Sequence, residues 1–435
     1  MSLLKFVEEK IQGIDLSYLD EKHPLGHELD EFAKQDGKGL AHYTEELTNW
    51  AKGHPGKILS AIHRVRPILT LKNISIVTSF DAVKDVLLRD QDFNVTYDDK
   101  MKAITEGVGF FLGWDDDSVK GTNDRINMQL AFRRDDIEKI INPLLKTLAA
   151  EHGEKLIQDK DLVADFFNPI PAKLAIQYFG FSNIEPDWLH KVTSGLFNYI
   201  FIDIANTPQI AERALGYAKE LREALDKEYS LKQAGPDTVL GRCISLHEKG
   251  VVGFDPVNVR NNILGLLIGL VPTTGKSAAM AFDYATQTED EALTTRTFFK
   301  GSTLKDAIIY TRELTRLNPI NPGLFRKAAA DAELFAAGKR HVIPKGNFVL
   351  ASTYTAMRDH KVIKEPLRVI PGRPASHYLT YGVGLHSCFG RYMNDIHVGS
   401  LLYYAYQASP LQRCKGKDGD LIFEGAFPQS LKISQ

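Results

Sequence analysis

The sequence is poor in cysteine: among its 435 residues only Cys243, Cys388 and Cys414 are cysteines. Cysteines this few and this far apart do not form a disulfide framework and are typical of a reducing compartment. The net charge is also small, −2, which excludes a nucleic-acid binder held by overall charge. Residues 1–24 carry acids among their apolar residues and lack a run long enough for a signal peptide or a membrane anchor. We therefore expect a cytoplasmic protein.

The chain also lacks repeats, low-complexity stretches and a Gly/Ser linker. Residues 1–55 are predicted to form a polar helical segment ahead of one domain, 56–435. Apolar residues recur at helical spacing over much of that domain, at 81–90, 134–159, 169–180, 186–204, 209–232, 255–285 and 303–317. Alternating, β-branched stretches near both ends predict short strands, at 58–79, 340–353 and 421–434. The predicted fold class is mainly α with a small β-rich side.

The most distinctive stretch is Leu379–Met393, LTYGVGLHSCFGRYM. A thiolate at Cys388 is an anion in a partly buried site, and backbone amides stabilise it if the chain curls around the sulfur. Gly382, Gly384 and Gly390 provide access to positive φ on both sides of Cys388. Apolar residues at helical spacing follow, so we expect a helix to begin there with its positive end toward the sulfur. The alternative is a buried structural cysteine beside a glycine-rich turn.

The spacing of the tyrosine, glycines, histidine and cysteine, YGxGxHxCxG, resembles the haem-binding loop of the cytochrome P450 family. Tyr381 replaces the usual phenylalanine. The resemblance implies haem b (iron protoporphyrin IX), with Cys388 as the proximal iron ligand and Gly382 and Gly390 in the binding loop. It also implies that His386 binds a haem propionate.

Two arginines outside the loop resemble the other propionate ligands of the family. Arg125 lies in GTNDRINMQLAF and Arg326 in GLFRKA, at the positions of the usual arginines. Gly121 stands where the first segment usually has a histidine, so one propionate contact is missing or replaced. Trp114 packs at the haem edge or, as the alternative, is a core tryptophan.

Glu313 and Arg316 are three residues apart on a predicted helix, so they share a face and can pair. Taken alone, the pair is an ordinary exposed salt bridge worth a few tenths of a kcal/mol. In the P450 family an E-x-x-R pair locks the core by binding a later arginine, and Arg373 stands where that partner is expected. The resemblance therefore implies a structural role for all three residues.

The apolar helix predicted at 255–285 departs from the family pattern. Most members carry an acid and a threonine at its centre, which relay protons to dioxygen. Thr273, with Thr274 beside it, is predicted at the oxygen site, but the acid position is Pro272, which has neither a proton nor a backbone donor. We expect Pro272 to free the carbonyl of Ile268 and kink the helix. The alternative is an inconsequential kink, with water relaying protons through Thr273 alone.

The same stretch, GLVPTTGKS, resembles a phosphate-binding P-loop. That motif requires Gly-x4-Gly-Lys, and Gly269 is one residue too early. The preceding residues are also predicted as helix and not as strand. We therefore exclude a nucleotide hydrolase.

The segments that would surround a substrate in this family are apolar and aromatic, which predicts a hydrophobic small-molecule substrate. They are 95–112 (with Phe110 and Phe111), 196–204, Leu266–Thr273, Ile320–Leu324 and Ala426–Phe427. The resemblance implies a monooxygenase that takes electrons from a ferredoxin or a flavoprotein. Arg133, Arg134 and Arg391 are candidates for the docking patch, with solvated surface charge as the alternative.

Two other functions stay open at this point. The missing acid at Pro272 favours a peroxide-dependent peroxygenase or a hydroperoxide-rearranging enzyme. A haem protein that binds or senses a ligand without turnover is the alternative of another class.

Overall fold

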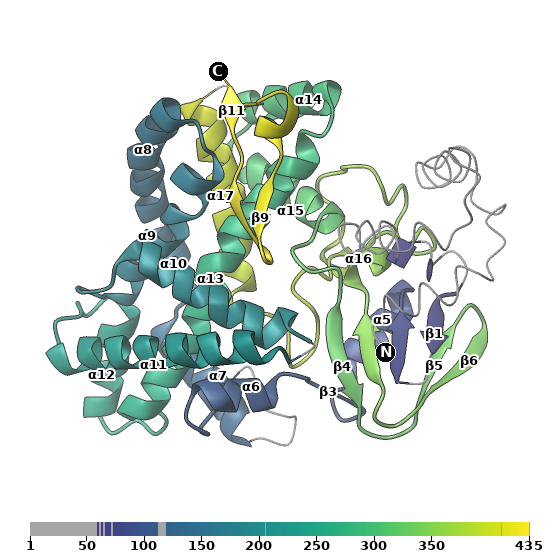
Figure 1. Cartoon of the computed structure of the whole chain (residues 1–435), viewed down its shortest axis with the longest axis horizontal. Helices are drawn as coiled ribbons and strands as arrows, with labels where there is room; N and C mark the ends of the chain where they lie inside the picture. The colour runs from purple at the N-terminus through teal and green to yellow at the C-terminus, as the bar shows by residue number, and fades with distance from the viewer. Residues whose placement is uncertain are drawn as a thin grey trace.

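In the computed structural model, the described residues are 59–60, 62–63, 66–70, 73–111, 119–204, 206–409 and 411–434. The predicted N-terminal segment 1–55 and Trp114 lie outside them. Helices make up most of the described chain and strands form small sheets, so the predicted fold class is confirmed. Figure 1 shows the helical part beside the β-rich part.

The helical part consists of α6 (Asp98–Ile104), α7 (Val119–Ala131), α8 (Asn142–Asp159), α9 (Pro169–Phe179), α10 (Pro186–Phe197), α11 (Pro208–Leu231), α12 (Val239–Glu248), α13 (Pro256–Ala285), α14 (Glu289–Gly301), α15 (Leu304–Leu317) and α17 (Arg391–Ala408). Three π-helical turns extend these helices: η3 (Ile137–Ile141), η4 (Val163–Phe167) and η5 (Asn198–Ile202). All seven helical ranges expected from apolar spacing are present. Their expected ends differ from the observed ends by at most three residues.

The β-rich part is built on a five-stranded sheet in the order β1 (Ile68–Thr70), β2 (Ile74–Val77), β7 (Phe348–Ala351), β4 (Leu324–Ala328) and β3 (Phe93–Asn94). β2 and β7 run parallel, and the other pairs are antiparallel. The hairpin of β5 (Ala332–Ala336) and β6 (Lys339–Ile343), α5 (Phe80–Leu88) and the short α16 (Thr353–Ala356) complete this part.

Two further strand pairs come from the C-terminal end of the chain. β9 (Ile422–Glu424) pairs with β10 (Phe427–Ser430), and β8 (Gln412–Arg413) pairs with β11 (Ile433–Ser434). β10 contacts α13 and η4, so this hairpin lies against the helical part, as Figure 1 shows. The strands predicted at 340–353 and 421–434 are therefore confirmed.

The prediction of strands over 58–79 is only partly right. β1 and β2 lie in this range, but residues 59–60 and 62–63 are helical. Leu59 is buried against β2 and β7, and Ile62, three residues on, packs on the same cluster. Spacing of three places both side chains on one helix face, and the alternation of apolar and polar residues concealed it.

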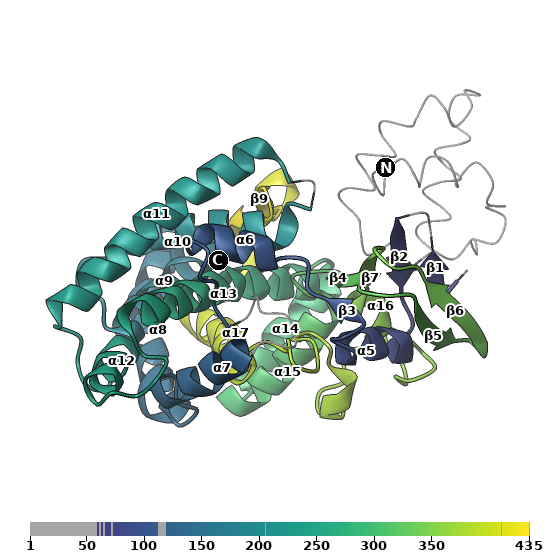
Figure 2. The same ribbon diagram turned by 90° about the horizontal axis from the view of Figure 1, so that it is seen from below.

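α13 is the central helix of the helical part and contacts α9, α10, α11, α15 and α17 (Figure 2). Asp255 caps it by accepting the Asn258 N–H at 3.1 Å, and Pro256 occupies its first position. Among the described helices it alone is long and apolar enough to cross a membrane, but 83% of its most apolar window is buried inside the protein. It is therefore a core helix. It continues through Pro272 as one element, and a kink there stays a prediction.

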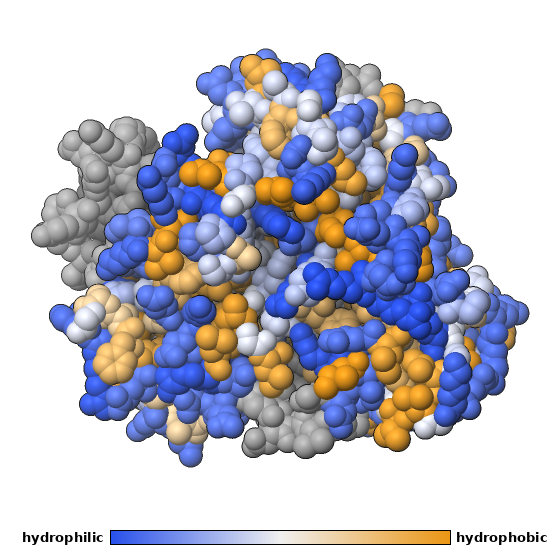
Figure 3. All heavy atoms as spheres, turned by 180° about the vertical axis from the view of Figure 1, so that it is seen from behind, coloured by the Kyte–Doolittle hydropathy of each residue, from blue (hydrophilic) through white to orange (hydrophobic). Residues whose placement is uncertain are grey.

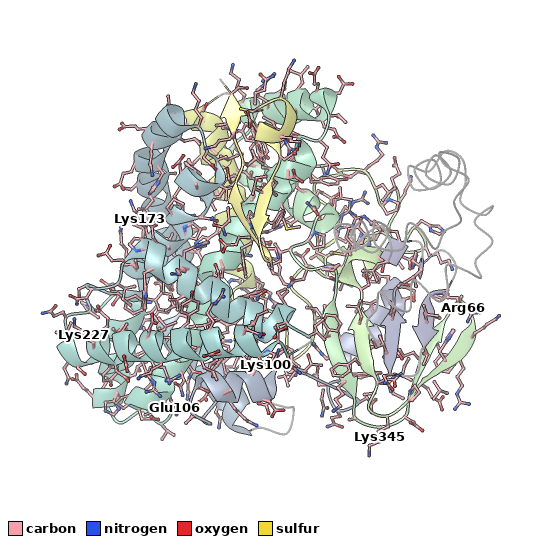
Figure 4. All side chains as sticks on the ribbon, in the orientation of Figure 1. Arg66, Lys100, Glu106, Lys173, Lys227 and Lys345 are labelled. Atoms are coloured by element: carbon pink, nitrogen blue, oxygen red, sulfur yellow. The ribbon has the colours of Figure 1, made fainter. Side chains whose placement is uncertain are left out.

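The outer surface is mostly polar. Figure 3 shows apolar patches separated by hydrophilic side chains on the face seen from behind. Figure 4 shows Lys227 and Lys345 at the outside of the molecule, where both are exposed.

Candidate functional site

The chain around Cys388 is a tight loop that ends at α17. Gly382 and Gly384 have φ of 65° and 79°, the left-handed region that favours glycine. A side chain at Gly384 would also meet the Leu87 carbonyl oxygen at 2.8 Å. The Cys388 N–H donates to the Tyr381 carbonyl at 2.9 Å, which closes the loop. Both glycines thus have the role expected from the sequence.

Gly390 has a different role from the one predicted. Its φ is −83°, which any residue adopts, so the expectation that it supplies positive φ is wrong. It is the residue just before α17, and its N–H donates to the Cys388 sulfur. The predicted helix does begin directly after Cys388, at Arg391, so its positive end points toward the thiol.

The Cys388 side chain is accessible to solvent, yet enough protein surrounds it that loss of hydration raises the pKa of the thiol. The Gly390 N–H and the charges of Arg125 and Arg391 act in the opposite direction and favour the thiolate. The exposure of Cys388 as a residue disfavours the alternative of a buried structural cysteine. Cys243 is the contrasting case, because it is buried and burial raises the pKa of its thiol to about 12.

The three predicted propionate ligands lie together beside this loop. Arg125 donates to the Ser387 carbonyl at 2.8 Å. Arg326 is buried, donates one N–H to the Phe325 carbonyl at 2.9 Å, and has no partner for Nε. Burial lowers the pKa of His386 to about 4, and the charges of Arg326 and Arg125 contribute. Neither arginine pairs with a carboxylate of the described residues.

The buried polar network around Glu313 excludes the exposed salt bridge considered above. Glu313 and Arg316 have no exposed side-chain surface and pair at 2.8 and 2.9 Å. The Nε of Arg373 donates to Glu313 at 2.9 Å, and the Tyr378 hydroxyl donates at 3.0 Å. Burial raises the pKa of Glu313, but Arg316, the Ile370 N–H and Arg373 outweigh it, so the net shift is downward.

The two threonines predicted at the oxygen site face different directions. The Thr273 hydroxyl donates to the carbonyl of Gly269, and Gly269 is exposed although residues 261–268 and 271–279 are buried. The Thr274 hydroxyl lies 2.8 Å from the Leu270 carbonyl and 3.0 Å from Asn394 Oδ1 on α17. The structure therefore brings Thr273, and not Thr274, to the accessible face of α13.

The family model named Cytochrome P450 matches residues 304–424. The 20-oxo-5-O-mycaminosyltylactone 23-monooxygenase of Streptomyces fradiae is 27% identical over 262 residues, 59% of this chain and 56% of its own length. The bifunctional dioxygenase–epoxy alcohol synthase of Fusarium oxysporum is 24% identical over 430 residues, 88% of this chain but 33% of that protein. The solved structure of the cytochrome P450 enzyme CYP109B1 from Bacillus subtilis has a TM-score of 0.70 at 18% identity, over 88% of this chain and 99% of that one. The family-model match, these relatives and the shared fold together support a cytochrome P450. The predicted resemblance to this family is thereby confirmed.

Haem is the cofactor of the family, and the residues of this P450 fit it. Cys388 offers an accessible sulfur with an amide donor and two cations around it. Arg125 and Arg326 supply two cations without a carboxylate partner among the described residues, which matches two haem propionates. The open backbone at Gly269 leaves room beside Thr273.

Tyr381 forms contacts that the usual phenylalanine of this P450 family cannot form. Its hydroxyl bonds to Asp395, which pairs with Arg312 at 2.9 Å, and lies 3.5 Å from the amide of Asn394. Asn394 also contacts Thr274, so a polar chain joins the cysteine loop to α13. The only sequence signal was the tyrosine itself, because its partners come from other segments.

Proposed function

We propose that this P450 is a haem b–thiolate monooxygenase that inserts oxygen into a hydrophobic small molecule, with Cys388 as the iron ligand. The observation that carries this proposal is the accessible Cys388 sulfur, which accepts the Gly390 N–H beside two arginines at the start of α17. Arg125, Arg326 and His386, from α7, β4 and the loop, would hold the propionates. The bound haem supplies an iron centre that activates dioxygen or a peroxide.

Thr273 is the side chain proposed to position the proton on the open face of α13. Its hydroxyl is held by the Gly269 carbonyl, which leaves the oxygen lone pairs free to accept from a water molecule. Pro272 has no proton to give, so Thr273 and water carry this task alone. Thr274 is oriented toward α17, and we assign it no catalytic role.

A row of aromatic side chains supports a hydrophobic substrate. Tyr97 contacts Phe201 at 5.0 Å between ring centroids, Phe201 contacts Phe197 at 4.7 Å, and Phe197 contacts Phe427 at 5.6 Å. These residues come from the predicted substrate segments 95–112, 196–204 and Ala426–Phe427. Two of these contacts are edge-to-face and one is tilted, and such contacts hold the rings in fixed orientations, as the apolar lining of a site for a hydrophobic ligand requires.

A patch on the thiolate side supports docking of a separate ferredoxin or flavoprotein. Arg134 stacks over the Tyr392 ring at 4.0 Å, and Arg391 donates to the Tyr392 hydroxyl at 2.8 Å. Arg133, Arg134 and Arg391 are exposed. Ordered cations beside the thiolate helix suit an acidic electron carrier. All three cysteines are free, which supports a soluble cytoplasmic enzyme in a reducing compartment.

A second candidate function is turnover driven by a peroxide or an organic hydroperoxide. The replacement of the acid by Pro272 favours it, because hydrogen peroxide already carries the protons that dioxygen reduction must import. The alignment over 88% of this chain with a protein named as an epoxy alcohol synthase is a further reason to test hydroperoxides.

Product formation from a panel of hydrophobic compounds tests these functions on the purified, haem-loaded protein. A ferredoxin, its reductase and NADPH are supplied in one set of reactions, hydrogen peroxide alone in a second, and neither in a third. Product that requires the reductase supports the monooxygenase, and product with peroxide alone supports the second candidate. No product in either set, together with ligand-induced shifts of the haem absorption band, would instead support a protein that binds without turnover.

A further inference from the structure

α13 carries a lysine in the protein interior. Lys276 is 5% exposed, although lysine is almost never this buried without a partner. Its ammonium has no hydrogen bond or ion pair with any described residue, and burial alone lowers the pKa of Lys276 to about 8. The group is therefore a cation at pH 7 that lacks an anion.

Lys276 lies on the same face of α13 as Thr273. Residual exposure on this helix follows helical spacing. Gly269 is exposed, and Leu266, Thr273, Lys276 and Ser277 keep 7%, 7%, 5% and 5% of their surface exposed. Val271, Thr274, Ala278 and Ala279 are closed, at 0%, 1%, 0% and 0%, whereas Leu270, next to Gly269, is partly exposed. Residues three and four apart share a helix face, so Leu266, Gly269, Thr273 and Lys276 lie along one side of α13, which is open to solvent at Gly269.

The ammonium of Lys276 stands at the end of the aromatic row. Its Nζ lies 5.4 Å from the centroid of the Phe427 ring, and the row continues through Phe197 and Phe201 to Tyr97. A cation held over a ring is partly stabilised, but this contact does not replace a counter-ion. The row of aromatic rings therefore ends at one positive charge that has no counter-ion among the described residues.

Two other charged residues of the helical part are matched within the protein. Lys100 on α6 donates to the Tyr199 carbonyl at 2.9 Å and lies 3.9 Å from Asp203. On η4, which packs against α13, Asp165 pairs with Lys155 at 3.2 Å. Neither contributes to the pKa of Lys276, and no second cation does so. A site with one positive charge suits a singly charged anion better than a phosphate dianion.

We propose that Lys276 binds the carboxylate of an otherwise apolar substrate, so that the natural substrate of this P450 is a hydrophobic carboxylic acid whose chain lies along the aromatic row. This proposal rests on the proposed function and adds the substrate class. The substrate carboxylate would be the counter-ion that the described residues do not provide for the Lys276 ammonium, in a site where little water competes for either charge. Thr273 is three residues away, about 4.5 Å along the helix axis, so the anchored acid lies near the residue proposed to position the proton.

Binding of a matched acid and alcohol tests the proposal. Fatty acids from C8 to C18 and the alcohols of equal length are titrated into the haem-loaded protein, with the haem absorption shift and equilibrium dialysis as two measures of Kd. We expect the wild type to bind at least one acid more tightly than its alcohol. Lys276→Met should raise the Kd for that acid roughly 30-fold or more and leave the Kd for the alcohol within about threefold. Lys276→Arg should keep most of the preference, and Lys227→Met, on the exposed face of α11, should keep all of it.

Two results overturn the proposal: a wild type that prefers none of the acids, or a Lys276→Met protein that binds the acid as tightly as the wild type. A role for Lys276 in folding alone would change yield and melting temperature without changing the preference for acid over alcohol. The reduced carbon monoxide spectrum of the same wild-type sample reports separately on the proposed function. A thiolate spectrum without acid preference rejects only the substrate class, whereas the absence of a thiolate spectrum rejects the proposed function.

Discussion

The two sides of the candidate haem site differ in whether a buried charge has a partner within the protein. On the thiolate side, Glu313 is bonded to Arg316, Arg373, Tyr378 and the Ile370 N–H, and none of its side chain is exposed. On the α13 side, Lys276 has no partner among the described residues. We propose that the matched charge holds the fold and that the unmatched charge marks the position of a ligand, because an unpaired buried charge is costly.

Arg125 and Arg326 belong to the second class although they lie near the cysteine loop. Both lack a carboxylate partner within the described ranges, and both lie close enough to His386 to lower its pKa. We propose that the same criterion separates residues that fix the fold from those that bind haem or substrate. The predictions below test this distinction, beginning with the largest effect.

Glu313→Ala should abolish the haem-loaded protein and not merely slow turnover. The substitution leaves two buried arginines without their carboxylate, which costs about 3–5 kcal/mol. That is a large share of a typical free energy of unfolding of about 5–15 kcal/mol. Soluble yield and haem content per protein measure the effect. Glu333→Ala, which removes an exposed pair with Arg340 in the β5–β6 hairpin, is the control and should behave as wild type. Normal haem content in Glu313→Ala would show that the network is not needed for folding or for haem binding.

Thr273→Ala should lower the rate of product formation in reductase-driven turnover by roughly 10²-fold, the lower end of what a positioned acid–base group contributes, and with it the amount of product formed per NADPH. Thr274→Ala is the matched control, because its hydroxyl faces Asn394 on α17, and it should couple like the wild type. Pro272→Asp should increase the product formed per NADPH because it restores an acid at this position. In all three variants, peroxide-driven turnover should change less than reductase-driven turnover. Equal coupling in Thr273→Ala and the wild type would remove Thr273 from the proton route.

Lys276→Met should stabilise the folded protein at pH 7 by about 3 kcal/mol, from a pKa of about 8 in the folded state against 10.5 when unfolded. Because the folded pKa is the lower one, the unfolded chain binds more protons between these values. The wild type therefore gains stability as pH rises from about 8, and its deficit against the variant should vanish above about 10.5. Denaturant unfolding of both proteins from pH 7 to 10.5 measures this. A constant difference across that range would show that the ammonium is not buried as a free cation.

Arg134→Glu should raise the apparent KM for a ferredoxin several-fold at low salt, and the effect should shrink at high salt because exposed charges are screened. Lys227→Glu, on α11, changes the net charge equally and should leave KM unchanged. Peroxide-driven turnover should be the same in all three proteins. A KM that does not respond to Arg134→Glu would assign this arginine to ordinary solvated surface.

The thiolate side was predictable from sequence because its residues act over short or fixed spacings. Cys388 and its glycines lie within ten residues, and Glu313 and Arg316 are one helical turn apart. Long apolar periods likewise located α8, α11 and α13, since helices of this length leave many repeats of the pattern. Gly390 was misjudged because sequence alone does not tell a glycine that needs positive φ from one that provides an amide beside a sulfur.

The α13 side could not be predicted from sequence in the same way. Lys276 was part of an excluded phosphate-binding pattern, and its significance depends on Phe427, 151 residues further along the chain. Burial of a lysine without an anion is a property of packing, and no spacing rule reports it. The separation of Thr273 from Thr274 also required α17, because only the contact with Asn394 shows which hydroxyl faces inward.

The absorption spectrum of the reduced carbon monoxide complex tests the central claim most directly. Wild-type protein purified with haem should show the red-shifted band typical of thiolate ligation, and Cys388→Ala should lose it, whereas Cys414→Ala, which removes another free cysteine, should keep it. A wild type without this band, or a Cys388→Ala protein that retains it, would contradict the assignment of Cys388 as the iron ligand.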